Sequence, residues 1–236
     1  MPRDNVREAS KIIESALAEG RSKLLEHEAL RLLRLYGLPV PEYCVARTRE
    51  EAERCGRILE KPLVAKIISP DIIHKSDVGG VILDIGNAEE AVRAYTKILF
   101  NVREKAPNAR IYGVLYQNMV PYGLEVIVGA KRDPVFGPVI LFGLGGVFVE
   151  ALKDVSLRVA PLSACEAYSM LGEIRASALL EGYRDKAPRD KRALASIILK
   201  IAQLMLDQPA VRELDLNPVM AYRRGAAVAD ARVILG

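Results

Sequence analysis

Residues 67–83 have the sequence IISPDIIHKSDVGGVIL, in which a polar segment separates two apolar runs. The apolar runs predict two strands, and the segment between them predicts a loop that ends at Gly79-Gly80. His74, one of two histidines in the chain, lies in this loop. An imidazole titrates near neutrality and is a good nucleophile, so it can accept a phosphoryl group and pass it on. A surface histidine in an ordinary turn fits the same pattern.

Strands and helices alternate on both sides of this loop. Helices are expected over residues 1–20, from Ser22 to Gly37, and over 49–60, 88–105, about 163–172 and 190–206. Strands are expected over residues 40–46, 63–68, 81–85, 111–120, 124–130, 138–142, 211–222 and 226–234, with a further apolar run at Val147–Leu152. This pattern predicts an α+β fold of two lobes. We expect a helical extension over residues 1–21, an N-terminal lobe over 22–111 and a C-terminal lobe over 112–236.

The composition narrows the partners and the compartment. The chain has 34 basic and 30 acidic residues and a net charge of +4. The chain lacks the basic runs with interleaved aromatic residues that are typical of nucleic-acid binding, and no apolar run reaches membrane-spanning length. The small excess of positive charge therefore favours anionic small molecules as ligands. The three cysteines, Cys44, Cys55 and Cys165, lack zinc-site spacing. Their odd number and the lack of a signal peptide favour a reducing cytosol, and we expect a cytoplasmic protein.

Lys66 and two glycine clusters are candidate phosphate ligands. Lys66 lies in an apolar strand, where burial of its charge requires an anionic partner such as a phosphate. A solvent-facing position on a half-exposed strand is the alternative. Gly79-Gly80 and Gly143–Gly146 allow backbone amides to approach phosphate closely. Neither cluster matches a P-loop or a dinucleotide fingerprint, and ordinary turns explain them equally well.

A carboxylate-rich strand near the C-terminus is a candidate Mg²⁺ site. Glu213, Asp215 and Asn217 alternate in sequence and therefore point to one face of a strand. Asp230 lies on the partner strand of the expected hairpin and is able to complete the group. Oxygen ligands of this kind suit Mg²⁺, which fills its remaining positions with waters and nucleotide phosphates. An amphipathic edge strand is the alternative, although acidic residues are depleted in strands.

Two weaker signals complete the candidate site. Gln117–Val120 ends one expected strand and can offer backbone groups to a base edge, while Glu125, which follows, can hold ribose hydroxyls. Arg158 lies near an expected turn, where it can reach phosphate oxygens, or it is an ordinary surface arginine.

The candidate residues occur in an order that resembles a known family. The stretches HKSDVGGV, GLEVIVGAKRDPVFGPVILFGLGG, DVSLRVAPL and ELDLNP resemble the ATP-grasp β subunit of ADP-forming acyl-CoA synthetases, most nearly the archaeal acetyl-CoA type. The resemblance covers about residues 22–236. It implies an ATP-grasp fold, in which two α+β lobes bind a nucleotide between them. It also implies an acetate–CoA ligase reaction that makes ATP from acyl-CoA, ADP and phosphate.

The resemblance assigns a role to each candidate residue. His74 matches the second of two histidines that relay the phosphoryl group to ADP. Lys66 and Arg158 would hold nucleotide phosphates. The expected Mg²⁺ ligands are Asp215, Asn217 and Asp230. The alternative role for Glu213 or Asp215 is a catalytic one, in which the carboxylate orients the phosphohistidine, and the sequence leaves both roles open. The remaining nucleotide contacts would come from Gln117, Met119, Val120, Glu125, Gly145 and Gly146. The chain departs from many ATP-grasp enzymes at Gln117-Asn118, where they carry acidic residues.

The resemblance also implies a partner. The CoA-binding domains and the first histidine lie in an α subunit, so we expect an α₂β₂ heterotetramer. Two other functions remain open from the sequence: an ATP-grasp ligase that joins a carboxylate to an amine through an acyl phosphate, and a non-catalytic subunit that senses nucleotide.

Overall fold

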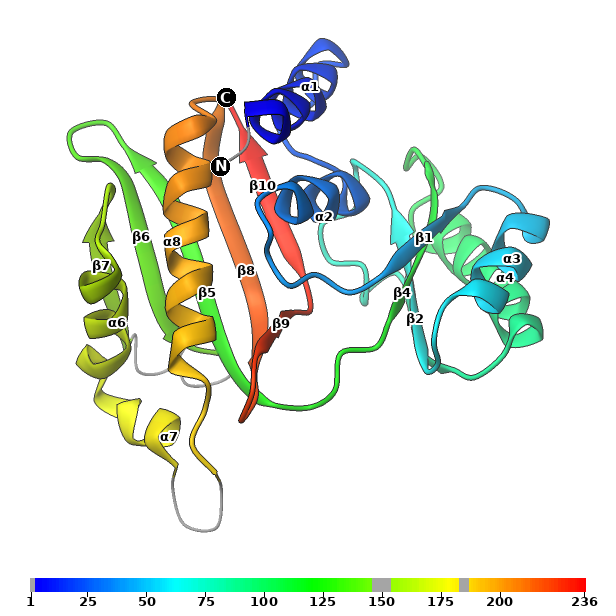
Figure 1. Cartoon of the computed structure of the whole chain (residues 1–236). Helices are drawn as coiled ribbons and strands as arrows, with labels where there is room; N and C mark the ends of the chain where they lie inside the picture. Colours follow the sequence, from blue (N-terminus) through cyan, green and yellow to red (C-terminus); the bar gives the residue numbers. More distant parts are fainter. Residues whose placement is uncertain (1–2, 146–153, 183–186) are drawn as a thin grey trace. The chain divides into compact units, whose positions relative to one another are not determined.

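A computed structural model describes residues 3–145, 154–182 and 187–236 (Figure 1). The chain forms two compact units. The first, which we call the histidine unit, comprises Leu25–Glu28 and Pro41–Met119. The second, which we call the pocket unit, comprises Met1–Leu24, Ala29–Val40 and Val120–Gly236. Each unit is described by itself below.

The bounds of these units differ from the predicted lobes over residues 1–21, 22–111 and 112–236. Most of the sequence before residue 41 packs with the second half of the chain rather than with the histidine loop. Ile13, Leu32 and Leu33 are fully or almost fully buried in the same core as Ile198 and Val211. Because burial of apolar surface drives such packing, the apolar faces of these helices decide which unit they join.

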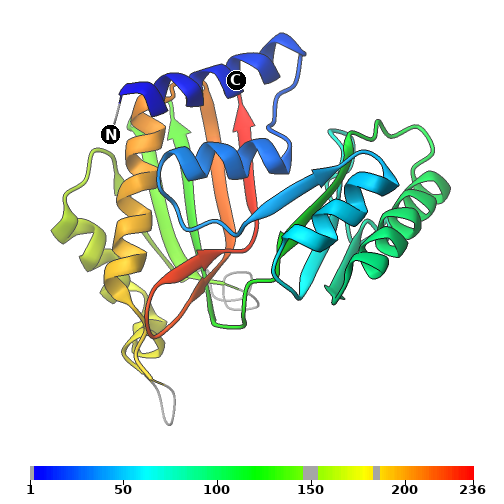
Figure 2. The same ribbon diagram turned by 45° about the vertical axis from the view of Figure 1, so that its right-hand side comes forward.

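The histidine unit contains a four-stranded antiparallel sheet in the order β1-β4-β2-β3, with two helices packed on it (Figure 2). Its elements are β1 (Tyr43–Ala46), α3 (Arg49–Ile58), β2 (Leu63–Ile68), β3 (Val81–Ile85), α4 (Ala88–Lys105) and β4 (Gly113–Asn118). Tyr116, Ile98 and Ile67 are fully buried in its core. The predicted strands over 63–68 and 81–85 and the helix over 88–105 are confirmed.

The start of α3 shows how local chemistry sets an element boundary. The Thr48 hydroxyl accepts a hydrogen bond from the Glu51 amide at 3.2 Å, as a helix N-cap requires. The Glu51 carboxylate accepts from the amide of Arg47, one residue earlier than a capping box predicts. Two amides at the helix start are thereby satisfied, one of them outside the expected pair.

A disulfide joins Cys44 of β1 to Cys55 of α3. The sequence did not predict this pair, because the spacing of cysteines along a chain does not reveal which of them approach each other in the fold. Cys165 is a free, exposed thiol.

The pocket unit contains a six-stranded antiparallel sheet. Five strands follow the order β10-β8-β5-β6-β7, and β9 pairs with β8. Its strands are β5 (Leu124–Asp133), β6 (Gly137–Leu144), β7 (Val155–Val159), β8 (Val211–Ala221), β9 (Ala226–Val228) and β10 (Ala231–Leu235). Its helices are α1 (Arg3–Ala18), α6 (Ala164–Glu173), the 3₁₀ turn η1 (Arg175–Ser177), α7 (Ala178–Glu181) and α8 (Lys191–Asp207).

Helices cover one face of this sheet and leave part of the other face open. α8 crosses β5 and β6, and α6 packs on β7 (Figure 1). Phe142 and Ile140 point into the core beneath these helices and are fully buried. By strand alternation the neighbouring Leu141 points to the opposite face, where it lines a pocket. One face of the sheet therefore forms the core with the helices, and the other lines the pocket.

Several predicted boundaries are wrong. α2 (Glu26–Leu35) begins four residues after Ser22, because Ser22, Lys23 and Leu24 pair with β10 instead. The segment around Arg158 forms β7 rather than a turn. The final predicted strand is divided into β9 and β10 at Ala229-Asp230. The apolar run Val147–Leu152 lies outside the described residues.

Across residues 3–145, 154–182 and 187–236, none of the helices combines the length and the apolar character that a membrane-spanning segment needs.

Candidate functional site

His74 lies in the exposed connection between β2 and β3. Its side chain is exposed, and so is that of Ile73, at 67%. Ile72, two residues before His74, is buried. The backbone carbonyl of His74 accepts a hydrogen bond from the Asp77 amide at 3.3 Å, which begins a turn. The ring is therefore outside the core and accessible to a reaction partner.

Side chains from other elements hold the His74 loop. Asp71 forms a bidentate ion pair with Arg110, with distances of 2.7 Å from Nη2 to Oδ1 and 3.0 Å from Nε to Oδ2. Lys105 of α4 donates to the backbone carbonyl of Asp77 at 3.0 Å. A large movement of His74 has to break contacts of this kind, so the length of the loop does not by itself determine its reach.

A buried carboxylate joins β2 to the same loop. Glu26, the first residue of α2, has its Oε1 2.6 Å from Lys66 Nζ and its Oε2 2.9 Å from Lys75 Nζ. The side chains of Glu26 and Lys66 are only 3% and 11% exposed. Burial alone raises the pKa of Glu26, but the two lysines outweigh that effect and lower the pKa to about 2. We call Glu26, Lys66 and Lys75 the ion triad.

The ion triad decides between the two interpretations of Lys66. The solvent-facing alternative is wrong, because the side chain is buried and has an anionic partner. That partner in this structure is Glu26, which the sequence analysis did not identify. A lysine within an apolar strand already indicated that some anionic group lies beside it, because a buried charge needs a partner. Forty residues separate the two partners, and no local pattern points from one to the other.

The end of β4 holds the predicted adenine-binding segment. Gln117 is almost fully buried, and the amide of Met119 donates to the carbonyl of Pro62 at 2.9 Å. The Met119 sulfur accepts from the amide of Asp84 at 3.3 Å. The buried side-chain oxygen of Asn118 has no hydrogen-bond partner within the part of the chain that the structure describes. Asn118 belongs to the predicted segment Gln117–Val120, although it was not named individually as a ligand, and its side-chain oxygen is able to accept a hydrogen bond.

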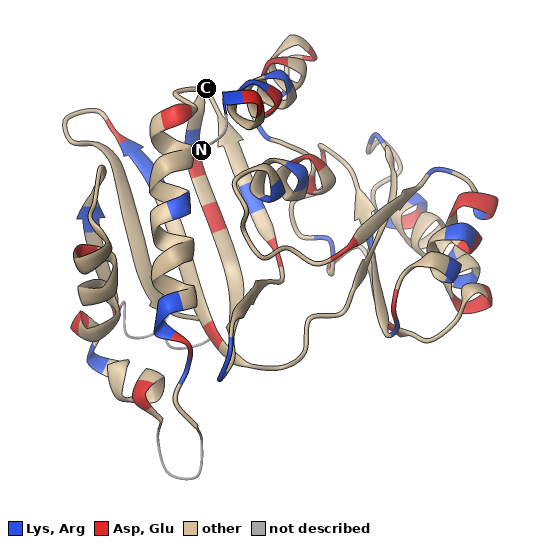
Figure 3. Cartoon of the chain, in the orientation of Figure 1, with Lys and Arg blue, Asp and Glu red and all other residues tan. Residues whose placement is uncertain are grey.

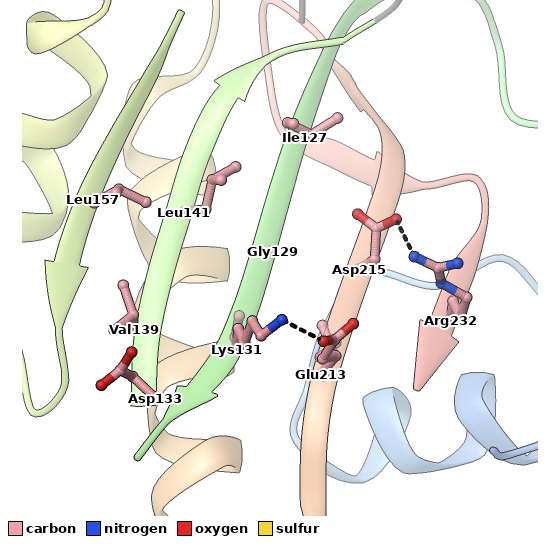
Figure 4. A pocket seen from close by; sticks show the side chains of 12 residues that line it. Ile127, Gly129, Lys131, Asp133, Val139, Leu141, Leu157, Glu213, Asp215 and Arg232 are labelled. Carbon is pink, nitrogen blue, oxygen red and sulfur yellow. Dashed lines mark ion pairs between the residues drawn. The ribbon is translucent and has the colours of Figure 1, made fainter. Parts of the chain in front are cut away.

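A pocket of about 440 Å³ lies on the open face of the pocket unit (Figure 4). Antiparallel register brings its residues together, since Gly129 of β5 and Arg232 of β10 both lie opposite Asp215 of β8. Its lining combines apolar side chains with two ion pairs and comprises Ile127, Gly129, Ala130, Lys131, Asp133, Val139, Leu141, Leu157, Glu213, Leu214, Asp215 and Arg232. Gly129 leaves room, because a Cβ built there would meet only ordinary contacts, at 3.6 and 3.8 Å.

The two carboxylates of β8 have different electrostatic environments. Lys131 Nζ lies 2.8 Å from Glu213 Oε1, and this hydrogen bond lowers the pKa of Glu213. Arg232 Nη2 lies 3.7 Å from Asp215 Oδ2, too far for a hydrogen bond. Burial raises the pKa of Asp215, with a smaller opposing effect from Arg232. Arg232, the partner of Asp215 drawn in Figure 4, therefore compensates this carboxylate only in part, and Asp215 is suited to a further cation. Acidic positions along β8 are red in Figure 3.

The predicted Mg²⁺ ligands lie around an irregularity in β8. The pairing with β5 shifts between Val126 and Val128, and the shift falls at Asn217 and Pro218. The register that pairs Ala231 with Leu216 brings Asp230 beside Asn217. One oxygen of Asp230 already accepts from the amide of Ala231 at 2.9 Å. Bulges commonly redirect side chains beside active sites, and these oxygen donors suit Mg²⁺.

The described part of the chain does not contain a metal site built from His, Cys, Asp and Glu side chains alone. No three or more His, Cys, Asp or Glu side chains gather there in a metal-binding arrangement. The amide of Asn217 and oxygens of the nucleotide would therefore have to supplement Asp215 and Asp230, as the chemistry of Mg²⁺ allows.

Arg158 lies on the other face of the same sheet. In β7 it is opposite Ile140, a core residue, and it forms an ion pair with Glu173 of α6. Ser156 donates to the same carboxylate at 2.7 Å. The next residue, Leu157, lines the pocket instead. The structure thus does not bring Arg158 together with Asp215.

Glu125 and Gly145 meet at the end of the pocket face. Glu125 alternates with Ile127 and Gly129 along β5, and its carbonyl accepts from the amide of Gly145 at 2.8 Å. A Cβ on Gly145 would come within 2.9 Å of Glu125 Cβ, so glycine is needed for this close approach. Gly146 lies outside the described residues.

Comparison with known proteins agrees with this architecture. The sequence matches the ATP-grasp domain family over residues 15–235. It is 50% identical over 232 residues to the β subunit of ADP-forming acetate–CoA ligase I from Pyrococcus furiosus, covering 98% of this chain and all of that one. The chain therefore belongs to the ATP-grasp family, and within it to the β subunits of ADP-forming acetate–CoA ligases.

Solved structures give the same result. Acetyl-coenzyme A synthetase 1 of Ca. Korarchaeum cryptofilum, in complex with coenzyme A, Ca-AMPCP and HgCl⁺, matches with a TM-score of 0.93 and 45% identity, over 97% of this chain and all of that one. A second structure of that protein, with coenzyme A and Mg-AMPPCP, matches with a TM-score of 0.85 and 42% identity over the same shares. Its phosphohistidine segment is described as pointing towards the nucleotide-binding site. The predicted ATP-grasp fold and family are confirmed.

Proposed function

We propose that this chain binds the nucleotide of an ADP-forming acetate–CoA ligase and that His74 relays a phosphoryl group to ADP. The observation that carries the proposal is the exposed His74 loop in a member of this family, one of whose solved relatives has a phosphohistidine segment pointing towards its nucleotide-binding site. In the proposed step a β-phosphate oxygen of ADP attacks phosphorus, the phosphorus–nitrogen bond breaks, and its electron pair returns to the imidazole.

Lys66 is proposed to bind nucleotide phosphates. Its ammonium is held charged and in place by Glu26, and one carboxylate shared by two lysines leaves the ion triad with a net positive charge. Phosphoryl transfer depends mainly on positioning and charge neutralisation, which such a group supplies. The same role for Arg158 requires that it leave Glu173 and the helix-covered face.

We assign Mg²⁺ to Asp215, Asn217 and Asp230. The raised pKa of Asp215 reflects a half-buried carboxylate that Arg232 compensates only in part, and a divalent cation would offset the remaining charge. When bound, the ion neutralises charge on the nucleotide phosphates. Glu213 is engaged by Lys131, so it is better placed to shape the pocket than to bind the metal. The other proposed nucleotide contacts are Gln117, Met119, Val120, Glu125, Gly145 and Gly146.

The reaction needs a partner chain. Relatives of this length are named β subunits, which supports a CoA-binding α subunit as the site where acyl phosphate forms. We propose an α₂β₂ assembly. In this arrangement His74 receives its phosphoryl group from the partner and delivers it to ADP.

The test is ATP synthesis by the assembled enzyme from acetyl-CoA, ADP and phosphate. The His74→Ala variant is expected to lose at least about 100-fold in rate, because no other group takes over the nucleophile's role. Ile73→Ala, which changes the exposed neighbouring side chain, is the matched control and should retain activity. Full activity of His74→Ala would overturn the proposal.

A further inference from the structure

Lys75 of the ion triad immediately follows His74. Glu26 contacts Lys75 and is therefore linked to the position of His74. Glu26 holds Lys75 through Oε2 while its Oε1 holds Lys66. We propose that Glu26 is a positioning residue for the phosphoryl relay: through Lys75, it sets the orientation of His74. This inference rests on the proposed function of His74.

The backbone of Lys75 is fixed as well as its side chain. Its carbonyl accepts from the amide of Gly80 at 2.8 Å, and the carbonyl of Gly80 accepts from the amide of Ile67 at 2.7 Å. A Cβ on Gly80 would lie 2.6 Å from Ile67 Cγ2 and 3.0 Å from the Lys75 carbonyl oxygen. Lys75 is thus bound to β2 through Gly80 and to α2 through Glu26. His74 is the residue immediately before Lys75, so these two attachments restrict the position of its Cα.

The charges of the ion triad suit a phosphorylated neighbour. Two ammonium groups and one carboxylate leave a net charge of about +1 at the base of the loop. A phosphoryl group on His74 adds negative charge that Lys75 is able to share, since its side chain is 23% exposed. Lys66 is more buried and stays with Glu26. The two lysines therefore have separate tasks, with Lys75 serving the loop and Lys66 serving the nucleotide.

Stability alone is a weak reason for such an arrangement. A buried ion pair often contributes less than well-packed apolar side chains of similar volume. Positioning explains why one carboxylate bridges a strand lysine and a loop lysine. By comparison, the exposed Asp71–Arg110 pair at the other end of the loop is solvated and expected to hold it only loosely.

The experiment measures how fast Mg-ATP phosphorylates His74 in the assembled enzyme, by rapid quench with radiolabelled ATP. Lys75→Met is the key variant, because it removes the loop contact and leaves the Lys66–Glu26 pair intact. We expect labelling to slow about tenfold or more, as loss of a close ion pair to a buried carboxylate predicts, with the apparent KM for ATP within about twofold of wild type. Lys75→Arg should restore most of the rate. Glu53→Gln, which removes an exposed ion pair with Arg57 in the same unit, is the control and should have no effect.

A double-mutant cycle separates positioning from general destabilisation. Glu26→Gln should slow labelling and also raise KM, because it releases Lys66. Adding Lys75→Met to Glu26→Gln should cause little further loss, since both changes break one connection. If His74 is labelled in the wild type and Lys75→Met is labelled at the same rate, this inference is overturned and the proposed function is not. No label on His74 in the wild type would overturn the proposed function, and the inference with it.

Discussion

Acid should weaken the histidine unit through one carboxylate. The pKa of Glu26 lies at about 2 in the folded chain, against 4.5 for an ordinary glutamate. Because this folded-state pKa is lowered, the ionised group stabilises the fold above about pH 4.5, and that contribution is lost as the pH falls towards 2. A difference of roughly 2.5 units corresponds to about 3 kcal/mol, at about 1.4 kcal/mol per unit. The side chain is 3% exposed, so solvent screening reduces this figure little.

The assay is urea unfolding of the wild type and Glu26→Gln, followed by circular dichroism at several pH values between 7 and 2. At pH 7 the variant should be less stable by about 3 kcal/mol, which agrees with the cost of leaving a buried charge such as that of Lys66 unpaired. The difference should shrink as the pH falls below about 4.5 and nearly vanish near pH 2. The Glu53→Gln variant serves as the exposed control. A difference between wild type and Glu26→Gln that stays constant across this range would refute the electrostatic account of the ion triad.

Three further predictions concern the disulfide, the pocket and the metal. Reduction of Cys44–Cys55, which closes a short loop with a sequence separation of 11, should cost about 3 kcal/mol, and an unchanged midpoint of thermal unfolding with reductant would contradict this. Gly129→Leu should fill the pocket and weaken Mg-ATP binding at least tenfold, as measured by calorimetry. An unchanged affinity of this variant would place the nucleotide elsewhere. Gly145→Ala should instead lower the midpoint of thermal unfolding, because its Cβ would collide with Glu125. Asp215→Asn should raise the Mg²⁺ concentration needed for nucleotide binding, since it removes a poorly compensated charge; an unchanged Mg²⁺ requirement would exclude Asp215 as a ligand.

The sequence predicted helices and strands well where the apolar pattern and the residues that begin or end an element indicate the same bounds. β2, β3 and α4 have the predicted bounds, because apolar runs end at a loop and because Asn87 caps α4 through the amide of Glu90. β7 was missed because Leu157 faces the pocket while Ser156 and Arg158 contact Glu173 of α6. Its pattern is inverted relative to that of a typical half-buried strand, so local hydrophobicity did not identify it.

The candidate site was predictable only in part. Alternation along β8 brings Glu213 and Asp215 to one face, as expected. Arg158 points away because alternation also governs β7, which had been taken for a turn. Glu26 and Lys75 could not be paired from the sequence, since their contact depends on how α2 approaches the loop rather than on either local pattern. Long-range ion pairs of this kind emerge only from the fold.

The most direct measurement of the relay is to locate phosphate in the assembled enzyme after incubation with radiolabelled ATP and Mg²⁺. Peptide mapping under alkaline conditions, which preserve phosphohistidine, should find acid-labile label on His74 that chases into ATP when ADP is added. Turnover at the normal rate with no phosphate on His74 would contradict the account.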